Sequence, residues 1–234
     1  MGTRRALVAT AVCVMAVAGC GAGGPVRFGT IKPSGDKVTI NADYSGNLAP
    51  AAQWPNACDL LTDDEIESVL PQASVDSDPT EVKIIGSGPT ESAPKGECAY
   101  EIGLPGTTSA HPVQLWLELL AVGDPSVISG RLDHPESTPS TSDERGGAAT
   151  RKDLHGSLGP QQCFRQRPRS DPEWTEYLFC QQGPVEFSLN AVTGGKADIQ
   201  AGGGASAKAQ ALFDKAVVQF PKAIAAKLPR AEVF

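Results

Sequence analysis

Six cysteines are spread along the 234 residues. The sequence around the first two indicates whether the chain is exported, and this decides whether the other four can form disulfides. Cys13 lies in an uncharged stretch, residues 6–18, that follows the basic pair Arg4-Arg5. The stretch has 13 residues, whereas a helix needs about 20 residues to cross a hydrocarbon core. A basic pair followed by a short apolar stretch therefore predicts a secretory signal peptide rather than a transmembrane helix.

The apolar stretch ends in Val17-Ala18-Gly19-Cys20, which resembles the bacterial lipobox. Small residues before the cysteine suit the lipoprotein signal peptidase, and the Cys20 thiol can carry a diacylglyceryl group. We predict that residues 1–19 are a signal peptide and that Cys20 holds the chain on the extracytoplasmic face of the cell membrane. An ordinary cleaved signal is the alternative, and we favour the general secretory route over the twin-arginine route.

Four cysteines follow position 20, and an even set in an exported chain is typical of disulfides. Four cysteines allow three connectivities, of which we favour the sequence-local one, Cys58–Cys98 and Cys163–Cys180. A zinc site is the alternative, but neither the cysteines nor the histidines have the spacing of zinc ligands. We therefore predict no metal and no cofactor.

Charge argues against one class of partner. Removing residues 1–19 takes away two arginines and no acidic residue, which leaves 18 basic and 27 acidic side chains and a formal net charge of −9. Such a surface repels nucleic acid and anionic lipid, so the predicted partner of the chain is the membrane through its lipid, not a polyanion.

We predict that residues 20–53 are a tether and that residues 54–234 are one disulfide-braced globular domain. The tether has two short alternating runs around Lys32-Pro-Ser-Gly-Asp36, which predict either a hairpin or a disordered stalk. About 30 flexible residues would give a mean reach of about 30 Å. A polar run at residues 134–149 predicts a mobile loop.

Two helices are predicted. Thr62 and Glu65 have the spacing of a capping box, which predicts a short helix over residues 62–70, ended by Pro71. Residues 205–228 predict a long amphipathic helix, with apolar residues at three- and four-residue spacings and lysines, including Lys227, on the other faces. Pro221 should kink or break it. We expect this helix to pack on a sheet, with a membrane-surface helix as the alternative.

Short apolar runs bounded by Gly and Pro predict strands, with a helical turn at residues 125–132. The predicted fold class is α+β: an antiparallel sheet of about five to seven strands, with a short N-terminal helix and a long C-terminal amphipathic helix packed on it. The strands are expected at residues 81–85, 97–104, 111–122, 162–166, 173–181 and 184–192.

The segment 56–65, NACDLLTDDE, resembles the start of a domain shared by many actinobacterial lipoproteins, a family with no assigned function. In that family a cysteine followed by Leu-Leu-Thr opens a short helix, and a second cysteine lies in a following strand, as Cys98 does here. A small residue and tryptophan often follow that cysteine, whereas this chain has Ala99-Tyr100. The resemblance implies the fold, supports a Cys58–Cys98 bond and implies no active site.

The sequence shows no catalytic motif. His111, His134 and His155 lack the spacing of metal ligands, and Ser157 is better explained by a turn than by a nucleophile. Glu173 and Glu176 have the residue type of a glycosidase pair, but a solvated strand edge is the simpler explanation.

Trp116 and Trp174 are expected to pack in or against the core, with contact to a sugar or lipid as the alternative. We therefore predict a non-enzymatic binding or interaction module at the bacterial cell envelope, whose partner is an envelope protein or a small apolar ligand. The alternatives are an accessory regulator of an envelope-stress sensor kinase and a cell-wall-directed hydrolase. A ligand pocket is expected between the sheet and the final helix.

Overall fold

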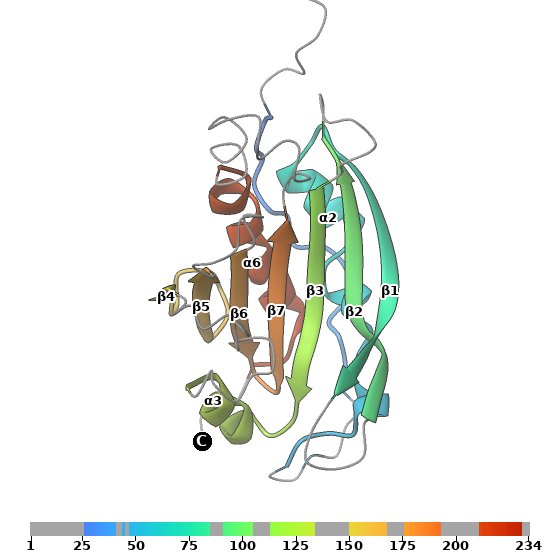
Figure 1. Cartoon of the computed structure of the whole chain (residues 1–234), viewed down its shortest axis with the longest axis vertical. Coiled ribbons are helices and arrows are strands. Elements are labelled where there is room, and N and C mark those ends of the chain that lie inside the picture. The colour runs from blue at the N-terminus through green and yellow to red at the C-terminus, as the bar shows by residue number, and fades with distance from the viewer. Residues whose placement is uncertain are drawn as a thin grey trace, which may run out of the picture.

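The computed structural model shows a single twisted antiparallel sheet with helices on both of its faces (Figure 1). The predicted signal peptide, the lipid-bearing Cys20 and the predicted 134–149 loop lie outside the residues that it describes. Those described are 26–40, 44, 47–84, 91–104, 113–133, 150–167, 176–192 and 211–230.

Seven strands lie in the order β1-β2-β3-β7-β6-β5-β4, and every neighbouring pair is antiparallel. Two meanders, β1 to β3 and β4 to β7, therefore meet at the central β3–β7 pair (Figure 1). This confirms the predicted α+β class. The strands are β1 Ser74–Ile84, β2 Glu91–Gly103, β3 Val113–Val122, β4 Thr150–Asp153, β5 Gln162–Arg167, β6 Glu176–Gln182 and β7 Val185–Val192.

The first two strands begin well before the predicted residues, and β4 was not predicted. Pro79 and Pro94 lie before the predicted ranges, and both occur where a proline removes no hydrogen bond between two interior strands. Pro79 lies on the edge strand β1, and Pro94 precedes the part of β2 that pairs with β3, which starts at Glu97. A register shift between Thr80 and Val82 accommodates this region.

One face of the sheet, here called the inner face, carries the main core. Side chains alternate along a strand, so Leu115, Leu117 and Leu119 of β3 point to one side and are buried. The helices α1 (Ala57–Leu60) and α2 (Asp63–Val69) and the C-terminal helices supply much of the rest of this core, and the 3-10 helix η1 (Ala51–Gln53) precedes α1 in the chain. In Figure 1 the inner face points away from the viewer.

The predicted short helix is confirmed as α2. Thr62 caps it by accepting a hydrogen bond from the Glu65 N–H, and the Glu65 carboxylate accepts one from the Thr62 N–H at 2.9 Å. The apolar residues that follow the cap, Ile66 and Val69, are fully buried. The preceding helix α1 was not predicted; Asn56 caps it through the Cys58 N–H.

The C-terminal element is not the long helix that the sequence predicts. Residues 211–215 are helical, a 3-10 turn η4 spans Val217–Gln219, and α6 spans Phe220–Lys227. Pro221 explains the break, because it has no N–H to donate and its ring excludes a regular α-helical turn before it. The apolar stripe still packs on the body as predicted, since Phe220 and Ile224 are buried.

Lys227 was predicted on the polar side of this helix, but it is buried in the protein. Its ammonium group donates to Glu65 Oε2 at 2.6 Å and to the Asp59 carbonyl oxygen at 3.2 Å. Glu65 is fully buried and Lys227 is 3% exposed. The two charges form a buried ion pair that joins α6 to α1 and α2.

The segment at residues 26–40 is neither a hairpin nor a free stalk. It has no assigned strand, yet it packs on the inner-face core, where Ile31 is buried. The Gly29 N–H donates to the Val69 carbonyl oxygen at 2.7 Å, and the Val38 N–H donates to the Lys227 carbonyl oxygen at 2.9 Å. Figure 1 shows this blue segment passing between α2 and α6. The folded body therefore includes residues assigned to the tether.

The structure contains two disulfides, and their pairing is the sequence-local one. Cys58–Cys98 joins α1 to the inner face of β2 across a separation of 40 residues. Cys163–Cys180 joins directly opposite residues of β5 and β6 across 17 residues. On the chain-entropy argument these closures stabilise the fold by about 4 and about 3 kcal/mol respectively.

The opposite face of the sheet, here called the outer face, is covered at one end by α3 (Pro125–Asp133). Its residue Leu132 packs on the stacked rings of Phe164 and Phe179, whose centroids are 5.0 Å apart. Arg131 Nε donates to Glu186 Oε2 at 3.0 Å. Burial raises the pKa of Glu186, and the Arg131 hydrogen bond opposes that shift. These contacts fix α3 to the sheet.

Replacing Lys227 tests the buried ion pair. We expect Lys227→Met to lower the free energy of unfolding by about 3–5 kcal/mol, because Glu65 would keep a buried charge without its partner. Urea unfolding at neutral pH measures this. Lys222→Met, on the same helix but exposed, is the matched control and should change stability by less than about 0.5 kcal/mol. Equal stability of the two variants would contradict the role assigned to the pair.

Candidate functional site

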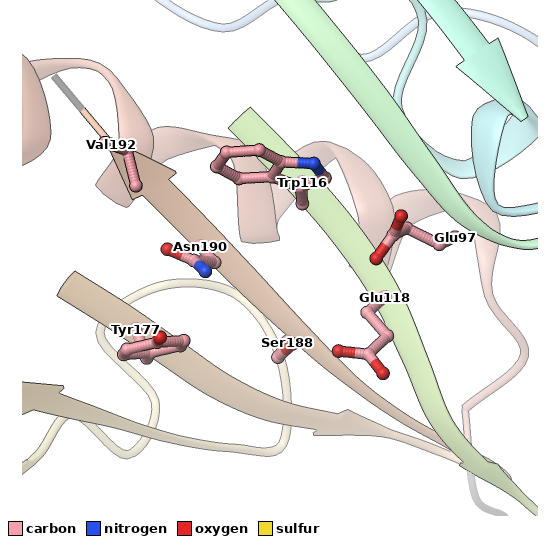
Figure 2. Close-up of a pocket in the computed structure, with 7 residues that line it drawn as sticks. All are labelled: Glu97, Trp116, Glu118, Tyr177, Ser188, Asn190 and Val192. Atoms are coloured by element: carbon pink, nitrogen blue, oxygen red, sulfur yellow. The ribbon is translucent and has the colours of Figure 1, made fainter. Parts of the chain in front are cut away.

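A pocket of about 300 Å³ opens on the outer face of the sheet, beside the part that α3 covers (Figure 2). It does not lie between the sheet and the final helix, where it was expected, because buried apolar side chains fill that space. Side chains from four strands line the pocket: Glu97, Trp116, Glu118, Tyr177, Ser188, Asn190 and Val192.

The register of the strands brings six of these residues into two rows across the sheet, and Val192 lies in the adjoining row, opposite Gln114. In one row Glu97, Glu118 and Ser188 lie opposite one another on β2, β3 and β7. In the next row Trp116 lies opposite Asn190, which in turn lies opposite Tyr177. All of these residues occupy the positions that alternate with the inner core residues.

Ser188 accounts for the hollow. Its neighbours in the row are Glu118 on β3 and Phe179 on β6, both with much longer side chains. A serine between two large residues leaves space above its own position, and Ser188 itself is 4% exposed. Figure 2 shows the Trp116 and Tyr177 rings on either side of Asn190, above this floor.

The two carboxyl groups of the pocket are directly opposite on neighbouring strands. Like charges in such a pair repel each other and destabilise a sheet. Burial, and next the charge of Glu97, raise the pKa of Glu118 to about 7. Glu97 Oε1 accepts a hydrogen bond from the Thr80 hydroxyl at 2.6 Å. Glu118 is therefore about half protonated at neutral pH, so a proton partly offsets the repulsion.

The pocket is rich in hydrogen-bond acceptors. Besides the carboxyl groups, Asn190 Oδ1 is buried and has no hydrogen-bond partner in the structure. A buried oxygen without a donor is costly, and such groups in native proteins call for an explanation. None of the seven lining residues is a lysine or an arginine. The pocket thus offers oxygen atoms to a ligand and has no fixed positive charge among its lining residues.

The arrangement is less suited to glycoside hydrolysis. Hydrolases of that kind use two carboxyl groups that flank the bond to be cleaved. Glu97 and Glu118 project from adjacent strands on the same face of the sheet, so both meet a bound molecule from one side (Figure 2).

The residues singled out in the sequence are distributed as follows. Trp116 lines the pocket, whereas Glu173, Trp174 and the side chain of Glu176 lie outside the described structure. The same is true of His111 and His134.

The other two candidates lie in the β4–β5 connection, away from the pocket. His155 is exposed there, and Ser157 forms the predicted turn, donating to the Leu154 carbonyl oxygen at 2.7 Å. Within the described ranges, no group of three or more His, Cys, Asp and Glu residues is placed to hold a metal ion.

Sequence reasoning missed six pocket residues, which a single sequence does not bring together: Glu97, Glu118, Tyr177, Ser188, Asn190 and Val192. One signal was available. Glu118 interrupts the apolar run of β3, and Ser188 and Asn190 interrupt that of β7, all at outward positions. Polar residues at alternating positions are also typical of a solvated sheet face, so this signal alone does not identify a pocket.

No family model matches the chain, and comparison with curated proteins and with solved structures found no match. The resemblance to actinobacterial lipoproteins therefore stays a prediction. No helix in the described part of the chain is both long and apolar enough to cross a membrane.

The protonation of Glu118 predicts a pH-dependent stability. Since its folded pKa of about 7 lies above the ordinary value of 4.5, its contribution to stability is complete below pH 4.5 and is lost as the pH rises through 7. That loss is at most roughly 3 kcal/mol. Glu118→Gln cannot ionise, so we expect the variant to be more stable than the wild type by about 1–3 kcal/mol at pH 8 and similar to it at pH 4.5.

Urea unfolding of both proteins at the two pH values measures this difference. Glu101→Gln, an exposed change on the same strand face as Glu97, is the control and should follow the wild type at both pH values. A constant difference between Glu118→Gln and wild type across the pH range would show that Glu118 has an ordinary pKa.

Proposed function

We propose that this protein is a lipid-anchored, extracytoplasmic binding module of the cell envelope, and that the outer-face pocket is its ligand site. One observation carries the proposal: the well-packed sheet contains a hollow that is lined by hydrogen-bond acceptors. A ligand in this hollow would relieve the repulsion between the two carboxyl groups and supply missing hydrogen-bond partners. Binding sites commonly retain such unfavourable local groups, since the ligand supplies the compensation.

Binding is favoured over catalysis by the placement of the two carboxyl groups. Both lie on one side of any molecule in the pocket, where they can hold a ligand but cannot act from its opposite sides. The pocket volume of about 300 Å³ is at the lower end of the range for small-molecule sites. It suits a small ligand or one end of a larger molecule.

The proposed lipid anchor is Cys20, and the packing of residues 26–40 limits how far the folded body can lie from it. Five residues lie between Cys20 and Val26, and the six extended Cα–Cα steps that join them span at most about 22 Å. A lipid on Cys20 would therefore hold the folded body close to the membrane, rather than at the end of a 30-residue stalk.

The anchor is tested by replacing its cysteine. We expect Cys20→Ser to abolish labelling by a radioactive fatty acid and to release the protein from the membrane fraction, because two acyl chains supply the stable attachment. Cys13→Ser is the matched control: it lies in the predicted signal peptide and should leave labelling and attachment unchanged. Lipid labelling of the Cys20→Ser chain would contradict the proposal.

The ligand site is tested with a variant that fills it. We expect Ser188→Leu to occupy the floor of the pocket, since this residue lies between Glu118 and Phe179. Saturation-transfer NMR with a mixed set of saccharides, amines, amino acids and organic acids should identify compounds that bind the wild type and not the variant. Ser74→Leu, exposed on the edge strand β1, is the control and should bind like the wild type.

The same spectra, followed over hours, also separate binding from turnover. A bound compound that stays chemically unchanged supports a binding module, and its conversion would favour the hydrolase. If no compound distinguishes the wild type from Ser188→Leu, while circular dichroism shows that the variant is folded, the pocket is not the ligand site.

A further inference from the structure

We infer that the outer-face pocket binds the ammonium group of a small organic cation, held between the Glu97 and Glu118 carboxylates and against the Trp116 ring. This inference rests on the proposed function and deepens it, because it names the chemical class of the ligand. It follows from the charge, the hydrogen-bonding groups and the shape of the pocket taken together.

The charge of the surroundings is the first argument. Glu97 on β2 and Glu118 on β3 face each other, and β7 and β6 add Ser188, Asn190 and Tyr177 as the neighbouring polar groups. Of these, Tyr177 is the other titratable group.

On α3, which packs on the same face, Arg131 is bound to Glu186 at 3.0 Å. None of the lining residues supplies a positive charge to balance the carboxyl pair. A cation would turn the repulsion between two carboxylates into two attractive interactions.

The hydrogen-bonding groups are the second argument. An ammonium group has three N–H donors and no acceptor, and the pocket presents complementary acceptors. The Glu97 and Glu118 carboxylates provide acceptors of this kind, whereas the Asn190 amide oxygen points away from them (Figure 2). Bonds from a charged donor to a carboxylate are stronger than neutral ones, so the same contacts favour an amine over an alcohol of equal shape.

The aromatic walls are the third argument. The Trp116 ring lies over the pocket, and Tyr177 lies on the far side of Asn190, stacked on Phe179 with a centroid distance of 5.9 Å. The face of an indole attracts a cation and also accepts an alkyl chain. The pocket volume of about 300 Å³ is at the lower end of the range for small-molecule sites. That space suits a primary amine with a short alkyl chain.

The protonation of Glu118 gives the inference a specific signature. With its pKa at about 7, a proton partly occupies the position that the ligand charge would take, so proton and ligand compete. An alkylammonium ion stays protonated from pH 6 to pH 8, as a lysine amine does. Over this range the ionised fraction of Glu118 rises about tenfold, and the affinity for the cation should rise by up to about the same factor.

The experiment compares n-butylammonium chloride with 1-butanol, a neutral molecule of nearly the same shape, at constant ionic strength. NMR titration follows the Trp116 indole N–H and the Asn190 side-chain amide. We expect saturable shifts with n-butylammonium, at least tenfold weaker binding of 1-butanol, and binding up to about tenfold weaker at pH 6 than at pH 8.

Two variants complete the design. Glu118→Gln keeps the shape of the pocket, and we expect it to weaken n-butylammonium binding at pH 8 by tenfold or more and to remove the dependence on pH. Glu101→Gln removes a charge from the same strand face outside the pocket, and it should behave like the wild type. If Glu118 had only a structural role, the Glu118→Gln change would not remove the pH dependence of n-butylammonium binding.

The outcomes separate this inference from the proposed function. If saccharides or other neutral compounds bind and Ser188→Leu blocks them, while n-butylammonium does not bind, the pocket is a ligand site and the cation inference is wrong. Equal binding of n-butylammonium by the wild type and Glu118→Gln at pH 8 would also overturn it. If no compound of any class binds, both proposals fail.

Discussion

The buried ion pair between Glu65 and Lys227 connects the parts of this fold that are farthest apart in the sequence. The Glu65 carboxylate caps α2 through Thr62, accepts the Ser34 N–H at 2.8 Å and accepts the Lys227 ammonium group at 2.6 Å. Lys227 also accepts the Val38 N–H through its carbonyl oxygen. The N-terminal segment, the first helices and the last helix therefore meet at one charged centre. A buried charge is tolerated when its lone pairs are occupied in this way.

The outer face shows the opposite situation. Glu97 and Glu118 face each other with no lysine or arginine among the lining residues, and no described residue donates to Asn190 Oδ1. On the inner side of the same sheet, the buried Glu65 of α2 is fully hydrogen-bonded. The fold can therefore satisfy a buried carboxylate, which makes the repulsion within the Glu97–Glu118 pair informative. The sheet tolerates the destabilisation caused by this pair because two disulfides and a continuous inner core already stabilise the fold. Groups that weaken a fold locally are typical of sites selected for binding.

Local signals in the sequence predicted those parts of the fold that local physics decides. The capping box of Thr62 and Glu65 identified α2, and the apolar stripe identified the C-terminal face that packs on the core. Predictions failed where a distant residue changed the outcome. The lysine spacing placed Lys227 in solvent, because nothing near it in the sequence reveals a buried Glu65. The first strand was predicted from residue 81, whereas β1 begins at Ser74, since the sequence does not show that β1 lies at an edge, where Pro79 is tolerated.

The sequence by itself determined the α+β class and the antiparallel strands, because alternation and turn residues are written along the chain. It left three disulfide connectivities open, and the favoured sequence-local one is the one that forms. Only the tertiary structure decided the site. Glu97, Glu118 and Asn190 belong to three strands, and the last is far along the chain from the first two. Their meeting depends on the pairing of β3 with β7 and on its register. A shift of one residue in the strand pairing would turn each of these side chains to the inner face. The pocket therefore depends on the strand register, which the packing of the inner-face core specifies.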